Sequence, residues 1–274
     1  MKSWKDLYDS HKLTIFVDIS TYCNAGCPQC HRTDFENGGL RKVGWLPLIR
    51  WSLQEFKEAY DPELIRRTDG WEICGTWGDP IMCKEMYEIA EYILTINPRT
   101  ELTIDTNGSV RPLSWWKKFG ELSSLCVDKG IIRCDFAVEG INQEMHAHYR
   151  RLTDLSKVLA NMKAFTDAGG KAKGFCVVHR HNQDYLQEIM DLCQAHGAMT
   201  VDYVENNRFY DGPSFEFTNE YDEIDEIEQI KGEYKKPKYV RDAQSDWKTR
   251  VEFNPALKEM VEKASQVDEE EDIH

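Results

Sequence analysis

The chain has 274 residues, of which 41% are hydrophobic and 30% are charged, an ordinary globular mixture that is long enough to bury a large core. Its net charge of −14 argues against a broad surface for nucleic acid or anionic membranes, because such surfaces need clustered lysine and arginine. Residues 1–12 lack the apolar region of a signal peptide and no apolar run approaches about 18 residues, so we expect a cytoplasmic protein without a transmembrane helix.

Short apolar strands alternate with amphipathic helices over the first three quarters of the chain. We predict strands over 13–19, 71–75, 101–106, 131–138, 174–179 and 199–204. Helices are predicted between them, over 52–60, 83–96, 112–122, 153–168 and 183–196. This α/β alternation implies a parallel sheet with right-handed crossovers, either a partial barrel or a doubly wound sheet. Both folds place their chemistry at the carboxyl ends of the strands.

The alternating pattern stops at about residue 205. We therefore predict a core domain over 1–205 and a short acidic C-terminal extension over 206–274, which ends in a disordered, solvated tail. Acidic residues crowd the stretch 216–228, and one further helix is predicted near 255–265. The functional alternative is that the extension forms a lid over the open end of the sheet.

The first predicted strand is followed by the polar loop CNAGCPQCH, residues 23–31. Its three cysteines can converge on one metal centre, because the glycine and proline between them favour a wrapped turn. Zinc usually takes four protein ligands, and the nearest fourth candidate, His31, directly follows Cys30, which makes joint chelation awkward. A four-iron four-sulfur cluster fits better, since three thiolates leave one iron free to bind something else. Inert buried thiols are the third alternative, disfavoured by the polar loop.

This pattern resembles the radical S-adenosylmethionine (radical SAM) superfamily, whose signature is Cys-x3-Cys-x2-Cys directly after the first strand, here Cys23, Cys27 and Cys30. The resemblance extends to about residue 205. It implies a partial (β/α)6 TIM-like barrel with parallel strands, a [4Fe–4S] cluster on these cysteines and S-adenosylmethionine at the open iron. It also implies reductive cleavage of S-adenosylmethionine to a 5′-deoxyadenosyl radical, which takes a hydrogen atom from a peptide side chain or a small metabolite.

The segment GTWGDP, residues 75–80, is similar to the Gly-Gly-Glu-Pro segment of the family, with Gly78, Asp79 and Pro80 at its last three positions. The resemblance implies that this segment binds the amino group of S-adenosylmethionine. Glycine has no side chain, so the amino group can approach the backbone closely. Trp77 and Asp79 depart from the usual glycine and glutamate. An ordinary turn is the alternative.

Two later segments carry further candidate cofactor ligands. Thr106 and Asn107 belong to a Thr-Asn-Gly run found in many members, although Asn-Gly turns are common anywhere. Glu139 stands where the family usually has aspartate, and the resemblance implies that it accepts hydrogen bonds from ribose hydroxyls. Either Arg150 or Arg151 would clamp the methionyl carboxylate through two parallel hydrogen bonds, unless both are exposed helix charges.

One departure concerns the adenine ring. The family typically has an aromatic residue before the third cysteine, where this chain has Gln29, which we keep as a candidate cofactor-binding residue. Tyr22 or Trp77 could stack on the ring instead, or backbone hydrogen bonds could hold it. The fifth predicted strand ends in further candidates for the cavity wall, namely His179, His181 and Asn182.

The resemblance implies an electron donor such as flavodoxin or ferredoxin and a peptide or small-molecule substrate, whereas the acidic balance disfavours nucleic acid. No catalytic residue is assigned beyond the cofactor ligands. Two hypotheses from other classes stay open at this point. One is a non-catalytic zinc or iron–sulfur module that recruits a partner through its acidic tail. The other is a nucleotide-binding α/β enzyme, disfavoured because no glycine-rich phosphate loop follows the first strand.

Overall fold

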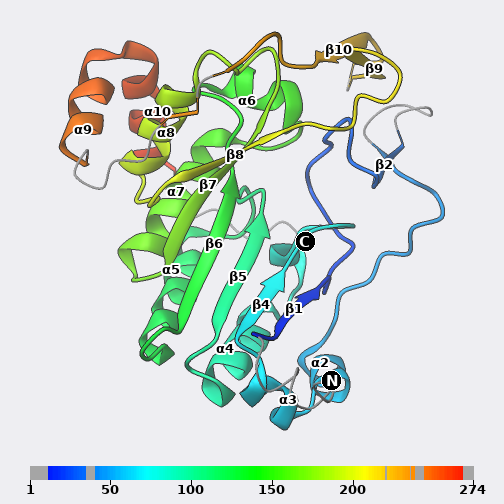
Figure 1. Ribbon diagram of the computed structural model, residues 1–274, viewed down its shortest axis with the longest axis vertical. Coiled ribbons are helices and arrows are strands. Elements are labelled where there is room, and N and C mark those ends of the chain that lie inside the picture. The colour runs from blue at the N-terminus through cyan, green and yellow to red at the C-terminus, as the bar shows by residue number, and fades with distance from the viewer. Residues whose placement is uncertain (1–11, 35–40, 220, 235, 238–243, 268–274) are drawn as a thin grey trace, which may run out of the picture.

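The computed structural model describes residues 12–34, 41–219, 221–234, 236–237 and 244–267, and its centre is a six-stranded parallel sheet (Figure 1). The strands are β1 (Thr14–Val17), β4 (Gly70–Ile73), β5 (Glu101–Thr106), β6 (Ile131–Ala137), β7 (Lys171–Val178) and β8 (Val201–Glu205). They lie side by side in chain order, and each pair is parallel. Because the strand order never reverses, the doubly wound alternative is wrong and the partial barrel is confirmed. No pairing of β1 with β8 closes the barrel in the described residues.

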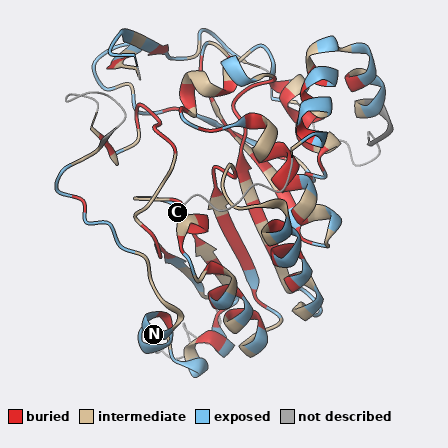
Figure 2. Cartoon of the chain, turned by 180° about the vertical axis from the view of Figure 1, so that it is seen from behind, coloured by how far each residue is buried: buried red, intermediate tan, exposed pale blue. Residues whose placement is uncertain are grey.

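Helices fill the connections between these strands. They are α2 (Leu53–Ala59), α3 (Pro62–Arg67), α4 (Met86–Ile96), α5 (Leu113–Glu121), α6 (Gln143–Tyr149), α7 (Leu155–Asp167) and α8 (Leu186–Ala195). Right-handed crossovers between strands in sequential order place their helices on one face of the sheet. The buried side of each helix faces the strands, as the colouring of Figure 2 shows. The apolar spacing that predicted α7 is explained by this packing, since Leu155, Val158 and Leu159 are fully buried.

The opposite face of the sheet, which lines the barrel interior, carries charged as well as apolar side chains. Alternate residues of β6 and β7 are buried against the helices, and the residues between them face the barrel interior. Arg133 on β6 bonds to Asp135 at 3.0 Å on that interior side, and Lys173 on β7 bonds to Asp202 on β8 at 3.0 Å. The open barrel therefore exposes a charged inner wall beneath the strand ends.

The extension after β8 has two differently placed parts. Strands β9 (Ser214–Thr218) and β10 (Ile224–Glu228) form an antiparallel hairpin whose Phe217 and Ile227 pack against Ala25, Cys27 and Tyr149. Helices α9 (Gln244–Phe253) and α10 (Pro255–Ser265) pack instead against α7 and α8. The acidic stretch therefore packs on the cysteine loop, and a lid over the open end of the sheet stays a prediction. The predicted disordered tail falls largely on residues 268–274, outside the described residues.

A two-residue strand pair, β2 (Thr33–Asp34) with β3 (Arg41–Lys42), extends the chain beyond the cysteine loop. None of the helices in the described part of the chain is long and apolar enough to cross a membrane.

Candidate active site

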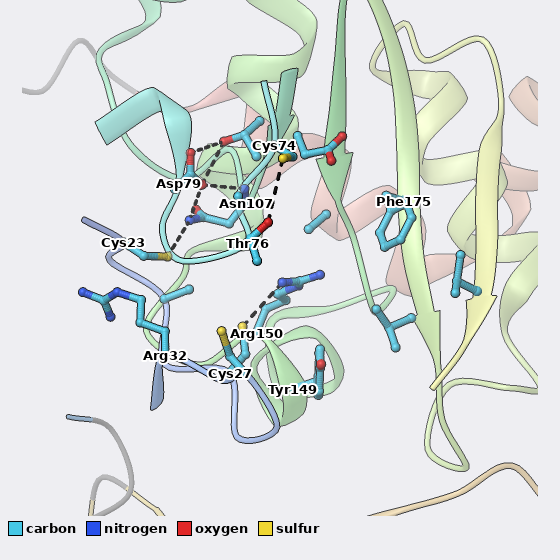
Figure 3. A pocket seen from close by; sticks show the side chains of 18 of the residues that line it. Cys23, Cys27, Arg32, Cys74, Thr76, Asp79, Asn107, Tyr149, Arg150 and Phe175 are labelled. Atoms are coloured by element: carbon cyan, nitrogen blue, oxygen red, sulfur yellow. Dashed lines mark hydrogen bonds between the residues drawn. The ribbon is translucent and has the colours of Figure 1, made fainter. Parts of the chain in front are cut away.

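Predicted site residues from several loops meet around one cavity of about 550 Å³ at the carboxyl ends of the strands (Figure 3). Those that line it are Cys23, Cys27, Cys30, Gly78, Asp79, Thr106, Asn107 and Arg150. Three other candidates, Gln29, Pro80 and Glu139, are buried beside the cavity and do not belong to its described lining. Most of the predicted residues are therefore neighbours in space, although more than a hundred positions separate the first from the last.

Backbone contacts fix the cysteine loop against two other loops of the site. The amide of Gly26 donates to the carbonyl of Arg151 at 3.0 Å, which ties the loop to the turn after α6. On its other side the loop touches the segment after β4. A Cβ atom at Gly78 would overlap the carbonyl of Ser20, so the glycine is needed for two backbones to meet. The three cysteines are thus held in place by main-chain contacts.

The carboxylate of Asp79 joins the loop after β4 to the end of β5. It is 3% exposed and accepts hydrogen bonds from the Thr106 hydroxyl at 3.0 Å and from the Asn107 amide at 2.8 Å. The side chain of Asn107 donates to the same carboxylate at 2.7 Å and also lies 3.8 Å from the Sγ of Cys23. A further bond, 2.9 Å long, comes from the amide of Ile81. This buried carboxylate therefore positions the donors that face the cysteine loop.

The structure separates the two arginines that sequence left as alternatives. Arg150 extends into the cavity, where its Nη1 donates to the Sγ of Cys27 at 3.5 Å and its Nε donates to Glu139 Oε1 at 2.8 Å. Arg151 instead lies 3.5 Å from Asp225 of the hairpin. Burial alone would lower the Arg150 pKa, but Glu139 and Cys27 raise it well above its ordinary value, so the guanidinium stays charged.

A family model described as the radical SAM superfamily matches residues 17–193, which contain the cysteine loop and the strands β4 to β7 of the sheet. The chain belongs to the radical SAM superfamily. A non-catalytic module is therefore excluded, and the protein is an enzyme of this family. Nothing in this match specifies the substrate.

Named relatives of the enzyme carry out different reactions. A GTP 3′,8-cyclase of Saccharophagus degradans is 28% identical over 130 residues, 47% of this chain and 37% of that protein. An AdoMet-dependent heme synthase of Oleidesulfovibrio alaskensis is 24% identical over 185 residues, 66% of this chain and 42% of that protein. The chain thus spans less than half the length of these two relatives.

Solved structures show the same fold. SuiB of Streptococcus suis has a TM-score of 0.55 at 13% identity, with 90% of this chain and 48% of that chain covered. The structure of anSMEcpe with bound AdoMet has a TM-score of 0.53 at 16% identity, with 71% of this chain and 51% of that chain covered.

Radical SAM enzymes bind a [4Fe–4S] cluster and S-adenosylmethionine, and the cysteine loop of this enzyme fits such a cluster. Its three cysteines are free thiols around one cavity. Burial raises the pKa of the Cys23 and Cys27 thiols, so their thiolates need a nearby cation, which bound iron provides. Across the described residues, no group of three or more His, Cys, Asp or Glu side chains is arranged to hold a single metal ion.

Gln29 links the cysteine loop to the segment that follows β8. Its side-chain Nε2 donates to the backbone carbonyl of Arg208 at 3.1 Å, and its backbone carbonyl accepts from Arg208 Nη1 at 2.8 Å. The Gln29 side chain also accepts from Asn206. This bridge joins the loops at the two edges of the sheet. Contact between Gln29 and the adenine stays a prediction, and the alternative stacking residues Tyr22 and Trp77 lie outside the described lining.

The residues at the end of β7 lie behind the cavity wall. Asn182 accepts from the backbone amide of His179 at 2.8 Å and donates to the carbonyl of Glu139 at 3.1 Å. Burial lowers the pKa of His179 and His181 to about 3, so both rings are neutral. None of the three belongs to the described lining, so a place for them in the cavity wall stays a prediction. The ribose contact of Glu139 stays a prediction, since its carboxylate is bonded to Arg150 outside the described lining.

Sequence reasoning missed the wall of the cavity that the sheet provides. Asp105 on β5 and Asp135 on β6 are paired in register, and both line the cavity together with Phe175. Asp135 is bonded to Arg133. The signal was present as an aspartate near the end of each apolar strand, since alternate residues of an open barrel face its interior.

Asp105 makes the stability of the metal-free protein depend on pH. Burial, assisted by Asp135 and Glu72, raises its pKa from 3.8 to about 7. The folded state therefore holds a proton that the unfolded state releases, and the free energy of unfolding falls as the pH rises from about 4 to about 7. Asp105→Asn is expected to match the parent at pH 4 and to exceed it by about 2 kcal/mol at pH 8, after allowance for partial exposure. Urea unfolding at both pH values measures this difference, and an equal difference at both would contradict it.

Proposed function

We propose that this radical SAM enzyme holds a [4Fe–4S] cluster on Cys23, Cys27 and Cys30 and abstracts a hydrogen atom from a peptide side chain or a small molecule. The proposal is carried by one observation: the three cysteines line the same cavity as Asn107 and Arg150, whose donors face them. When bound, the cluster and S-adenosylmethionine supply reductive cleavage of the sulfonium to methionine and a 5′-deoxyadenosyl radical.

The chain's own residues bind and orient the cofactor in this proposal. Arg150, which lines the cavity together with Arg32 and Arg208, is the cationic group that we assign to the methionyl carboxylate. Gly75 and Gly78 bring backbone without side chains to the same wall, where carbonyl groups can accept from the amino group. Asp79 fixes the position of this segment relative to the loop that contains Asn107, through its hydrogen bonds with Asn107.

The hairpin after β8 supports radical chemistry because it covers the cysteine loop with apolar side chains. Phe217 is 3% exposed and Ile227 is fully buried, and both pack against Cys27 and its neighbours. A carbon radical must be shielded from stray hydrogen donors, and a dry cover of this kind excludes water from the loop. We therefore propose that this hairpin serves as the lid.

The sheet wall indicates the kind of group that the substrate presents. Asp105 and Asp135 supply carboxyl oxygens, while Phe175 and Val177 supply an apolar surface in the same cavity. A substrate that places a hydrogen-bond donor or a cationic group beside an aliphatic carbon would match both. SuiB has been crystallised with its precursor peptide, which makes peptides the first class to test. Flavodoxin or ferredoxin is the expected electron donor.

The test is release of 5′-deoxyadenosine by protein that has been purified and reconstituted without oxygen. With S-adenosylmethionine and dithionite we expect turnover that is absent when either is left out. The protein is then incubated with peptides deuterated on their aliphatic side chains, and the deuterium content of the 5′-deoxyadenosine is measured. Deuterium in this product identifies the abstracted hydrogen. Failure to release 5′-deoxyadenosine from cluster-loaded protein would falsify the proposal.

A further inference from the structure

The buried ion pair of Arg150 and Glu139 contacts one sulfur of the cysteine loop, that of Cys27. Arg150 Nη1 donates to Cys27 Sγ at 3.5 Å (Figure 3). The Nε of the same guanidinium donates to Glu139 Oε1 at 2.8 Å. Cys27 is 6% exposed and the Glu139 side chain is fully buried. Cys23 has a different neighbour, the neutral carboxamide of Asn107. The three sulfurs therefore do not experience the same electrostatic surroundings.

The contact between Arg150 and Cys27 is held from both sides by the main chain. The amide of Gly26, next to Cys27, donates to the carbonyl of Arg151 at 3.0 Å. The amide of Arg150 itself closes α6 by donating to the carbonyl of His146 at 2.9 Å. Because both backbones are fixed, the guanidinium is a preorganised donor whose position does not depend on a flexible surface side chain.

Glu139 partly neutralises the positive charge of Arg150. In the described residues its Oε2 is buried without a hydrogen-bond partner, while its Oε1 accepts from Arg150. His146 lies beside it but contributes no charge. Burial lowers the pKa of His146 to about 3, and its Nδ1 accepts from the Glu139 amide at 3.3 Å. The charges nearest to Cys27 are thus one guanidinium and one carboxylate behind it.

Hydrogen bonds and positive charge at a ligating sulfur stabilise the reduced form of an iron–sulfur cluster, which carries one more negative charge. We propose that Arg150 raises the reduction potential of the cluster through Cys27, and that Glu139 offsets part of this effect. Arg150 is thus a tuning residue as well as the candidate partner of the methionyl carboxylate. This inference rests on the proposed function, since it requires that Cys27 ligate the cluster.

The test is an EPR-monitored redox titration of the reconstituted protein without S-adenosylmethionine, with iron and sulfide measured in every sample. Arg150→Gln removes the charge and weakens the donor, so its midpoint potential is expected to fall below that of the parent. Glu139→Gln leaves the guanidinium uncompensated, so its midpoint is expected to rise. Arg150→Lys, which keeps the charge, is expected to lie between the parent and Arg150→Gln. Arg99→Gln, at an exposed arginine paired with Asp128, serves as the control with an unchanged potential.

Shifts of opposite sign in Arg150→Gln and Glu139→Gln support the inference, because a merely structural ion pair would give the same change when either partner is removed. Equal potentials in all variants, or shifts in one direction only, overturn it. If Arg150→Gln fails to hold a cluster, the midpoint potentials of Glu139→Gln and Arg150→Lys test the inference instead: a rise in the first and a fall in the second support it. A parent protein that holds no cluster would overturn the proposed function itself, which distinguishes the two failures.

Discussion

Cys27→Ala is expected to lose the iron–sulfur cluster and, with it, all detectable release of 5′-deoxyadenosine. Cys27 lies in the middle of the cysteine loop and is buried between Arg150 and the hairpin, so no solvent molecule can readily replace its thiolate. With two thiolates the cluster would be undercoordinated. Iron, sulfide and the visible absorbance of anaerobically reconstituted protein measure the loss, and 5′-deoxyadenosine release is expected to fall by more than the roughly 10–100-fold that loss of an outer-shell partner costs at a metal site.

Cys126→Ala is the matched control for this experiment. Cys126 is a free, half-buried cysteine outside the described lining of the cavity. Its replacement is expected to preserve both iron content and 5′-deoxyadenosine release. Retention of a full cluster by Cys27→Ala would contradict the assignment of this cysteine as a ligand.

Asp79→Ala is expected to lower the free energy of unfolding of the metal-free protein by about 3–5 kcal/mol. The buried carboxylate accepts bonds from the side chains of Thr106 and Asn107 and from the amides of Asn107 and Ile81. Its removal leaves these donors without an acceptor in a place that water does not reach, at a cost of roughly 1–3 kcal/mol for each group left unsatisfied. Urea unfolding measures the loss without any contribution from the cluster.

Asp154→Ala provides a control of the same chemistry at an exposed site. Asp154 caps α7 by accepting from the amides of Ser156 and Lys157, and loss of such a cap costs about 1 kcal/mol. If Asp79→Ala cost no more than Asp154→Ala, the central position of Asp79 in the site would be refuted.

The sheet and the cysteine loop could be predicted from sequence because both depend on local patterns. Apolar runs identified the six strands, and the spacing of Cys23, Cys27 and Cys30 needs no knowledge of distant residues. The short helices α3 and α6 were missed, since six or seven residues show too little periodicity to recognise. The N-cap of α3, Asp61 followed by proline, was the available signal.

Pairings across the chain could not be predicted in the same way. Sequence could not choose between Arg150 and Arg151, because one residue of difference turns the side chain from the cavity to the hairpin. The role of Gln29 at the cofactor stays a prediction, and its contacts with a segment nearly 180 positions later, at the opposite edge of the sheet, could not be foreseen from sequence. The hairpin was read only as an acidic stretch, since its exposed charges outnumber its two buried apolar residues.

The EPR spectrum of the reduced protein, recorded with and without S-adenosylmethionine, tests the central claim most directly. A cluster held by three cysteines keeps one iron open, so we expect about four irons and four sulfides per chain and a signal that changes when S-adenosylmethionine is added. Protein isolated without oxygen that contains no iron, or a signal identical in both samples, would contradict the account.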